Sequence, residues 1–357
     1  MNADEFSSRM IEILNHGALN LAMGIGYKAG LFDVMAEMDG PEPVEKIADK
    51  AGLNARYVRE WMGVVACGGI VEVDQDSAGE DRYYLPEEHA QFLTTDSGDS
   101  NLGVYTQEIP LLTRCAMDQV EKGFVTGEGV DFSFYPEFQS FMAQLSDAKH
   151  EKVLVEKFLP CVDKGRLVER LEKGIRVCDL GCGQGVALIL MARRFPNSVF
   201  TGIDNHEQAV ETGREKAQGL GNINFMVQDA ALIENDERFR QKFDYITAFD
   251  AIHDQTQPMA ALKGIVWMLA PGGMFSMVDI DAQTSIAGNL EHPMGPFLYG
   301  VSLMHCMPVG FVNGGTGLGM MWGRHKALQM LEQAGFEKID VLEMEHDPFN
   351  VHYLCRR

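Results

Sequence analysis

The residues with the clearest chemical meaning form a glycine-rich loop at the end of an apolar segment. Residues 177–185 read Val-Cys-Asp-Leu-Gly-Cys-Gly-Gln-Gly, so an apolar strand pattern leads into an acid and then into three alternating glycines. Glycine accepts positive φ and lets the backbone approach a ligand closely. We therefore predict that Gly181, Gly183 and Gly185 form the binding loop of a nucleotide-like cofactor.

The spacing of these glycines separates two kinds of cofactor. The dinucleotide fingerprint Gly-x-Gly-x-x-Gly requires a glycine at position 186, where this chain has Val186. The carboxylate of Asp179, at the strand end, would repel a pyrophosphate and suits a cationic ligand. The sequence therefore favours S-adenosylmethionine (SAM), with S-adenosylhomocysteine as product, over a nicotinamide or flavin cofactor or a purely structural turn.

The elements that position this loop alternate between strand and helix patterns after Arg176, which predicts a parallel sheet covered by helices on both faces. After a helix over 324–334, a turn at 347–350 predicts an antiparallel terminal hairpin. We therefore predict an α/β fold with a mostly parallel, Rossmann-like sheet. The expected parallel strands are 176–179, 199–203, 223–227, 245–249 and 274–279, and the hairpin strands are 339–342 and 352–355.

Polar residues at the strand ends are the candidates for ligand binding, because ligands of such sheets bind at the carboxyl ends of the strands. Asp179 suits the α-ammonium group of a methionine moiety, Asp204 the ribose hydroxyls and Asp229 the adenine amine. Each acid alone is equally well explained as a cap on the next helix, but their succession favours a ligand site. The predicted cofactor-binding residues are Asp179, Gly181, Gly183, Gly185, Asp204, Asp229, Ala230, Phe249 and Asp250.

Five segments in this half of the chain carry a family resemblance. In order, they resemble the conserved blocks of class I SAM-dependent methyltransferases, and the resemblance extends from Arg176 to Arg357. It implies that the chain is a SAM-dependent methyltransferase. The five segments are 177–185, 200–204, 228–229, 243–249 and 269–273.

A second resemblance concerns His253 and Asp254. Small-molecule methyltransferases of the plant O-methyltransferase type carry a His-Asp pair after the fourth strand, where the histidine is the general base, and they have an N-terminal winged-helix domain. This resemblance implies that His253 removes the acceptor proton and that Asp254 caps or orients. The alternative is a histidine at a helix start that bonds to a backbone carbonyl.

The N-terminal part reads as a helical and winged-helix domain over residues 1–165, followed by a SAM-binding domain over 166–357. Helices near 44–52 and 55–66 precede two short strands at 70–73 and 82–85. By analogy with winged-helix relatives, we expect the first domain to form a homodimer and to cover the acceptor.

A DNA-binding regulator that responds to SAM is the alternative from another functional class. Arg56 and Arg59, with Glu60 beside them, form no basic face, and the net charge of −22 would repel a phosphate backbone. We therefore expect a small-molecule acceptor, and neither nucleic acid nor a membrane, as partner.

The cellular location and the metal content are predicted from membrane-span, signal-peptide and metal-ligand patterns that the sequence lacks. No apolar run approaches the roughly 20 residues of a membrane span, and the N-terminus has no signal-peptide pattern, so we expect a cytoplasmic protein. The seven cysteines include no Cys-x-x-Cys pair, which indicates reduced thiols. The spacing of His292, His305 and Cys306 matches no familiar zinc pattern, so no metal is expected.

The acceptor pocket is the least determined part. An aromatic segment at 124–141 and a methionine-rich insertion at 288–323 are candidate walls, although both also suit core packing. The insertion, with segments 21–30 and 57–69, resembles a winged-helix subfamily of bacteria and animals in which some members are associated with small-thiol methylation. We therefore favour a small thiol acceptor over a hydroxyl, with a nitrogen or carbon acceptor as the remaining alternative. The predicted pocket residues are Phe134, Tyr135, Tyr299, Met304, His305 and Trp322.

Overall fold

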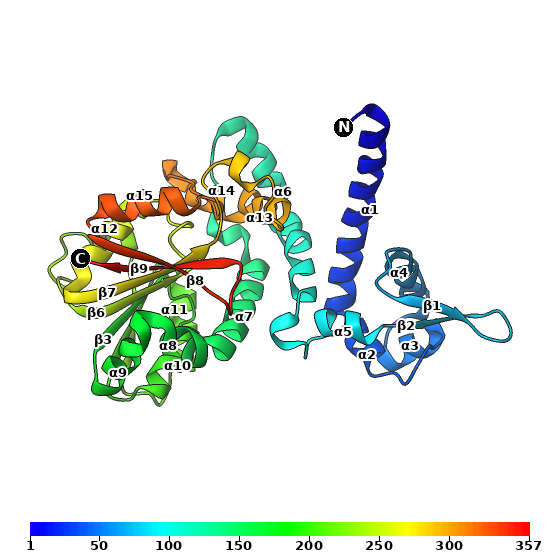
Figure 1. Ribbon diagram of the computed structural model, residues 1–357, viewed down its shortest axis with the longest axis horizontal. Helices are drawn as coiled ribbons and strands as arrows, with labels where there is room; N and C mark the ends of the chain where they lie inside the picture. The colour runs from blue at the N-terminus through cyan, green and yellow to red at the C-terminus, as the bar shows by residue number, and fades with distance from the viewer. The chain divides into compact units, whose positions relative to one another are not determined.

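The computed structural model describes residues 1–357, apart from the side chains of Asp99 and Gln139 (Figure 1). The chain divides into two compact units, Met1–Arg114 and Cys115–Arg357. The sequence patterns instead predicted a domain boundary after residue 165. The difference arises because residues between 115 and 165 pack against the large sheet: the side chains of Leu154, Phe158 and Val162 belong to one of its hydrophobic cores.

The N-terminal unit contains a winged helix. Helix α3 (Val44–Ala51) is capped by Gly52, whose φ of 66° is left-handed and stops the helix. Asn54 caps α4 (Ala55–Cys67) by accepting from the Arg56 and Tyr57 amides. Strands β1 and β2 pair antiparallel as the wing. The elements of this unit are α1 (Ala3–Lys28), α2 (Leu31–Ala36), α3 (Val44–Ala51), α4 (Ala55–Cys67), β1 (Glu72–Gln75), β2 (Asp81–Tyr84) and α5 (Glu87–Leu93), and α6 (Glu108–Thr126) runs from this unit into the next.

The second unit is built on a seven-stranded sheet that is preceded by helical segments. Its helices up to the last parallel strand are α7 (Pro136–Val153), α8 (Leu159–Cys161), α9 (Arg166–Lys173), α10 (Val186–Arg194), α11 (Glu207–Lys216) and α12 (Pro258–Met268). Its strands are β3 (Arg176–Leu180), β4 (Val199–Asp204), β5 (Ile223–Val227), β6 (Phe243–Phe249), β7 (Leu269–Ile280), β8 (Lys338–Glu343) and β9 (Asn350–Arg356).

The strand order is β5-β4-β3-β6-β7-β9-β8, with β9 antiparallel to both of its neighbours. The order reverses between β3 and β6, which are the strands that carry the glycine loop and the segment leading to His253. This is the class I methyltransferase fold, so the predicted fold class and terminal hairpin are confirmed. The reversal point is where ligands of open α/β sheets bind.

Two hydrophobic cores hold this sheet between helices (Figure 1). Side chains of α12 and α15 (Arg324–Ala334) pack on one face, and side chains of α9, α10 and α11 pack on the other. The buried strand patterns of β3 and β6 therefore contact apolar side chains on both sides, as expected for parallel strands.

The insertion folds as a series of short helices: η7 (Ile286–Asn289), α13 (Gly295–Val301), the π-helical turn η8 (Ser302–Cys306), α14 (Met307–Gly310) and η9 (Val312–Gly314). The aromatic segment contacts it directly, because the Val130 amide donates to the Pro308 carbonyl over 2.9 Å. The Tyr135 hydroxyl also donates to the Met304 carbonyl over 2.8 Å. The two predicted pocket walls are therefore neighbours. In the described part of the chain, no helix combines the length and apolarity needed to cross a bilayer.

Candidate active site

The glycine loop between β3 and α10 adopts the left-handed conformation that favours glycine. Gly181, Gly183 and Gly185 have φ values of 73°, 52° and 73°. A Cβ atom on Gly185 would lie 2.1 Å from Cε1 of Phe225, so that position is also closed to any side chain. A Cβ on Gly183 would meet no described atom within 4 Å, so open space lies beside the middle of the loop.

The acid that ends β4 holds this loop in place. Asp204 accepts from the Gly183 amide through Oδ2 and from the His206 amide through Oδ1, each over 2.8 Å. Its side chain is half-buried, and each carboxylate oxygen retains a lone pair for a further donor. The structure therefore brings the predicted ribose acid directly against the predicted binding loop.

The acid in β3 is buried beneath the loop. Asp179 is 3% exposed and accepts from the Thr247 hydroxyl over 2.6 Å. Burial raises the pKa of Asp179 to about 7, although the hydrogen bond from Thr247 opposes this shift. The carboxyl group can therefore change charge near neutral pH.

The remaining predicted cofactor residues are in more varied settings. Asp229 is exposed and accepts from the Ala231 amide over 2.8 Å, so it caps the short helix at Ala230–Leu232 as the alternative interpretation proposed. The Phe249 ring lies 4.9 Å from the His150 ring. Asp250 has a φ of 48°, and Asn350 Nδ2 donates to its carboxylate over 3.1 Å. The end of β6 is thereby tied to the start of β9.

The histidine that follows β6 is buried between two carboxylates. His253 is 3% exposed, and its Nδ1 lies 2.7 Å from Oδ1 of Asp279, which is 1% exposed. Because an ionised carboxylate only accepts, the Nδ1–H donates to Asp279. The other ring nitrogen, Nε2, lies 3.3 Å from Oδ1 of Asp254. The ring is thereby oriented by Asp279 with Nε2 toward Asp254.

The charges around His253 set its proton affinity. Burial alone would lower its pKa, but the carboxylates of Asp279 and Asp254 outweigh burial and hold the pKa well above 6.5. Such an imidazole is a stronger proton acceptor than a solvent-exposed one.

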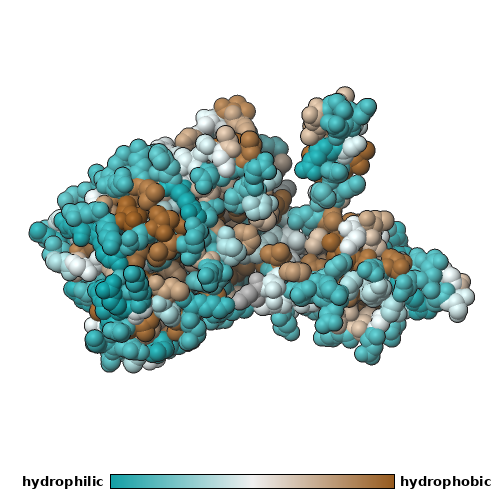
Figure 2. Space-filling model, in the orientation of Figure 1, coloured by the Kyte–Doolittle hydropathy of each residue, from teal (hydrophilic) through white to brown (hydrophobic). Residues whose placement is uncertain are grey.

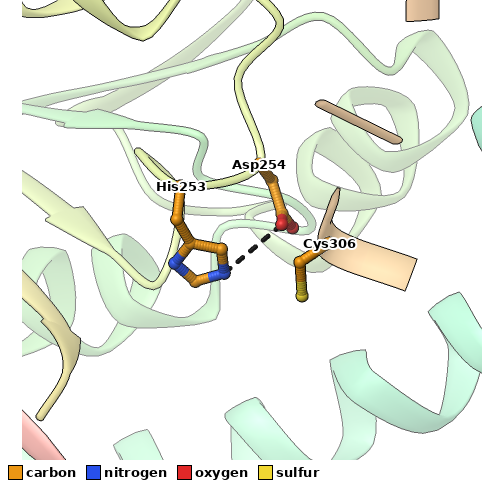
Figure 3. Close-up of side chains that lie close together, drawn as sticks. All are labelled: His253, Asp254 and Cys306. Atoms are coloured by element: carbon orange, nitrogen blue, oxygen red, sulfur yellow. Dashed lines mark ion pairs between the residues drawn. The ribbon is translucent and has the colours of Figure 1, made fainter. Parts of the chain in front are cut away.

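A cysteine from the insertion completes this cluster. Cys306, the last residue of the η8 turn, is 4% exposed, and Figure 3 shows its side chain beside those of His253 and Asp254. Burial raises the pKa of the Cys306 thiol to about 12. The sequence had considered Cys306 with His292 and His305, whereas the fold places it with His253 and Asp254.

The predicted pocket residues separate into two groups. The His305 ring is 7% exposed and contacts the Tyr135 and Phe138 rings at centroid distances of 4.8 and 4.7 Å. The His253 and Asp254 charges both act on it, so it belongs to the same neighbourhood. Met304 adjoins this group, because its carbonyl accepts from the Tyr135 hydroxyl.

The other predicted pocket residues have different surroundings. Trp322 is 5% exposed and packs in the core shared with α12 and α15. The Tyr299 oxygen accepts from Asn289 Nδ2 over 3.0 Å, and its ring packs in a separate small cluster between the insertion and the end of β7. Phe134 is 43% exposed. The composition of a segment does not reveal which of its aromatic residues turn toward the sheet core.

The sequence analysis did not assign Asp279 or Asn350 to this site, and it grouped Cys306 with His292 and His305 instead of with His253 and Asp254. The sequence did contain a signal for Asp279, because this residue ends an expected strand just as Asp179 and Asp204 do. Cys306 and Asn350 had no local signal, because their partners come from distant parts of the chain.

Comparisons with known proteins agree with this architecture. Residues 171–335 match the family model described as a methyltransferase domain, and residues 17–95 match the Rv2258c-like winged HTH domain. The chain is therefore a SAM-dependent methyltransferase with an N-terminal winged-helix domain.

Individual relatives are distant. A demethylmenaquinone methyltransferase of Staphylococcus aureus is 25% identical over 182 residues, covering 48% of this chain and 71% of the relative. Human N-acetylserotonin methyltransferase in complex with SAM has a TM-score of 0.64 at 17% identity, covering 100% of this chain and 99% of the other. An O-methyltransferase family protein from Burkholderia thailandensis has a TM-score of 0.66 at 14% identity, with 98% of each chain covered. These structural similarities establish the shared fold.

Proposed function

We propose that this methyltransferase transfers the methyl group of SAM to a small thiol and that His253 accepts the thiol proton. The observation that carries the proposal is the buried contact between His253 and Asp279 near the reversal point of the sheet. Asp279 fixes the ring and leaves Nε2 as the proton-accepting atom. Catalysis of this kind contributes typically 10²- to 10⁴-fold in rate.

The cofactor residues fit SAM through their individual chemistry. The Gly181–Gly185 loop offers closely approachable backbone and open space at Gly183. Asp204 would accept from the ribose hydroxyls, and Asp179 in its ionised form would bind the α-ammonium group. Ala230, Phe249 and Asp250 would border the adenine and methyl ends. When bound, SAM supplies an electrophilic methyl group on a positively charged sulfur and leaves as S-adenosylhomocysteine.

The proton affinity of His253 favours a thiol. A thiol has an ordinary pKa near 8.5, so the neutral form of a histidine with a raised pKa can take its proton, and the imidazolium that results stabilises the thiolate as an ion pair. An aliphatic hydroxyl is a far weaker acid and would hold its proton until attack. The acceptor sulfur then forms the new bond to the methyl carbon, and its proton remains on Nε2 of His253.

The acceptor pocket is proposed to lie around this cluster. Tyr135, Phe138 and His305 provide aromatic surface near Asp254, and Met304 adjoins them. Asp254 would orient the acceptor or the imidazole. The carboxylates of Asp254 and Asp279 both lie beside the single imidazole of His253. The site therefore suits a neutral or cationic thiol better than a thiol that carries a carboxylate.

The N-terminal unit is proposed to form a homodimer through α1. This helix exposes large apolar side chains along its length (Figure 2), including Phe6, Ile11 and Leu14, which are 55%, 59% and 68% exposed. Several large apolar side chains exposed on one element are typical of protein interfaces. Sedimentation equilibrium of the full chain should give twice the monomer mass, and a monomer at micromolar concentration would contradict this proposal.

A nucleic-acid partner is disfavoured by the charges of the winged helix. Arg56 pairs with Glu60, and Arg59 pairs with Glu45, so the two arginines of α4 are both engaged with acids. Together with the net charge of −22, this leaves a small molecule as the proposed partner.

The acceptor class is tested by incubating the protein with methyl-labelled SAM and matched pairs of small thiols and phenols, with products identified by mass spectrometry. We expect labelled thioethers to form faster than labelled ethers. Methylation of the phenols alone would replace the thiol proposal with O-methyltransfer. A protein without either activity that shows salt-sensitive binding to random duplex DNA would instead be a regulator.

A further inference from the structure

We propose that His253, Asp254 and Cys306 form a binding site for a soft divalent metal ion, with Zn²⁺ as the natural choice, and that the metal competes with methyl transfer. The ligands would be His253 Nε2, an Asp254 carboxylate oxygen and the Cys306 sulfur. The metal site goes beyond the proposed function. Only the competition with methyl transfer rests on the proposed function, because the metal would occupy Nε2 of His253, the atom proposed to accept the proton of the thiol.

The distances suit a tetrahedral ion. The three ligand atoms all lie within 4.8 Å of one another, and His253 Nε2 is 3.3 Å from Asp254 Oδ1. Two ligand atoms bound at about 2.0–2.1 Å in tetrahedral geometry lie about 3.3 Å apart. The sulfur would have to approach to roughly 3.6 Å from the nitrogen. Because 4.8 Å is the upper limit of the present separations, a displacement of at most about 1 Å at Cys306 is sufficient.

The unsatisfied oxygen of Asp254 is a second, independent observation. The Asp254 side chain is 27% exposed, but its Oδ1 atom is buried and meets no described donor with hydrogen-bond geometry, and its contact with His253 is a 3.3 Å ion pair. A buried carboxylate oxygen without a hydrogen bond is costly, because it has lost its water without gaining a donor. A metal ion at this position would satisfy that oxygen.

Asp279 supplies the outer contact that metal-binding histidines need. It accepts from the Nδ1–H of His253 over 2.7 Å and is itself 1% exposed. A histidine that binds metal through one nitrogen almost always donates its other N–H to a carboxylate, a carbonyl or water. The ring is therefore already in the tautomer and orientation that a metal at Nε2 requires.

The donor set selects the kind of ion. One imidazole, one thiolate and one carboxylate match the nitrogen, sulfur and oxygen ligands of Zn²⁺, and the two negative charges balance the ion. Magnesium and calcium prefer oxygen ligands and are disfavoured by the thiolate. Binding releases the Cys306 thiol proton, and any proton on Nε2, to solvent, and no redox change occurs.

Metal and acceptor proton would compete for the same nitrogen. With Nε2 bound to the metal, His253 cannot accept a proton, so methyl transfer should fall as the metal binds. The ligands also come from two segments, the loop after β6 and the η8 turn, so the ion would fasten the insertion to the sheet.

The binding test uses Co²⁺ as a spectroscopic probe with the full-length, chelator-treated protein. We expect one equivalent to bind with a thiolate-to-cobalt charge-transfer band. Cys306→Ser should abolish that band, and Asp279→Asn should weaken binding about 10- to 100-fold. The matched control Cys355→Ser removes another buried cysteine and should keep the band. No stoichiometric band, or a band that persists in Cys306→Ser, would overturn the site.

A separate activity measurement distinguishes the two proposals. Zinc should inhibit methyl transfer by the metal-free protein, and inhibition of Cys306→Ser should require at least about 10-fold more zinc, each relative to its own metal-free rate. Stimulation by zinc, or equal sensitivity of the two proteins, would overturn the competition. A metal-free protein that binds cobalt but transfers no methyl group to thiols would overturn the proposed function and leave the metal site intact.

Discussion

Nδ1 of His253 lies 2.7 Å from Oδ1 of Asp279, and both side chains are almost completely buried. The two residues come from neighbouring strand ends, since His253 follows β6 and Asp279 lies near the end of β7, which pair in parallel. A carboxylate in this position selects the tautomer of the imidazole and stabilises its protonated form. The arrangement thus prepares Nε2 to receive a proton.

The substitution Asp279→Asn should separate positioning from cofactor binding. The amide removes the charge that raises the pKa of His253, so we expect kcat to fall at least about 10-fold. The dissociation constant for SAM should stay unchanged, because Asp279 is assigned no contact with it. Asp118→Asn, on the exposed surface of α6, serves as the matched control and should retain wild-type kcat. A parallel loss of SAM affinity in Asp279→Asn would indicate general structural damage instead.

The substitution Asp204→Ala should weaken SAM binding. It removes the acceptor proposed for the ribose hydroxyls and also the anchor of the Gly183 amide. Hydrogen bonds to charged groups contribute about 1.5–3 kcal/mol each, which corresponds to a loss of roughly 10- to 100-fold in affinity. Isothermal titration calorimetry measures the dissociation constant for SAM. The control is Glu207→Ala, which changes an exposed residue of the adjacent helix α11 and should keep the wild-type affinity. An unaltered dissociation constant would remove Asp204 from the ribose site.

SAM affinity should depend on pH through Asp179. Burial raises the pKa of Asp179 to about 7, so below this pH the free protein carries a neutral carboxyl group that attracts the α-ammonium group poorly. Affinity should therefore increase as the pH rises through about 7 and then level off. In Asp179→Asn the dependence should disappear and affinity should stay low. A wild-type affinity that is constant between pH 6 and 8 would exclude this contact.

Much of the fold was predictable because its signals are local. The strand patterns ending at Asp179 and Asp204 and the glycines of the binding loop are each visible within a few residues, and β3, β4 and the loop occur where expected. The antiparallel pairing of β8 with β9 was predicted from the turn between them.

The site beyond the loop was less predictable because its contacts are distant in sequence. Cys306 meets His253 only because the insertion folds back over the end of β6, and no spacing rule contains that information. Trp322 and Tyr299 show the same limit, since an aromatic residue suits a pocket and a core equally well until the chain direction is known.

The most direct test of the account compares the wild type with His253→Ala, using the thiol that the product screen identifies. SAM dissociation constants and single-turnover methyl-transfer rates are measured for both proteins in metal-free buffer. We predict equal SAM affinity and a rate at least about 100-fold lower in His253→Ala. An unchanged rate of thiol methylation would contradict the role of His253 as proton acceptor.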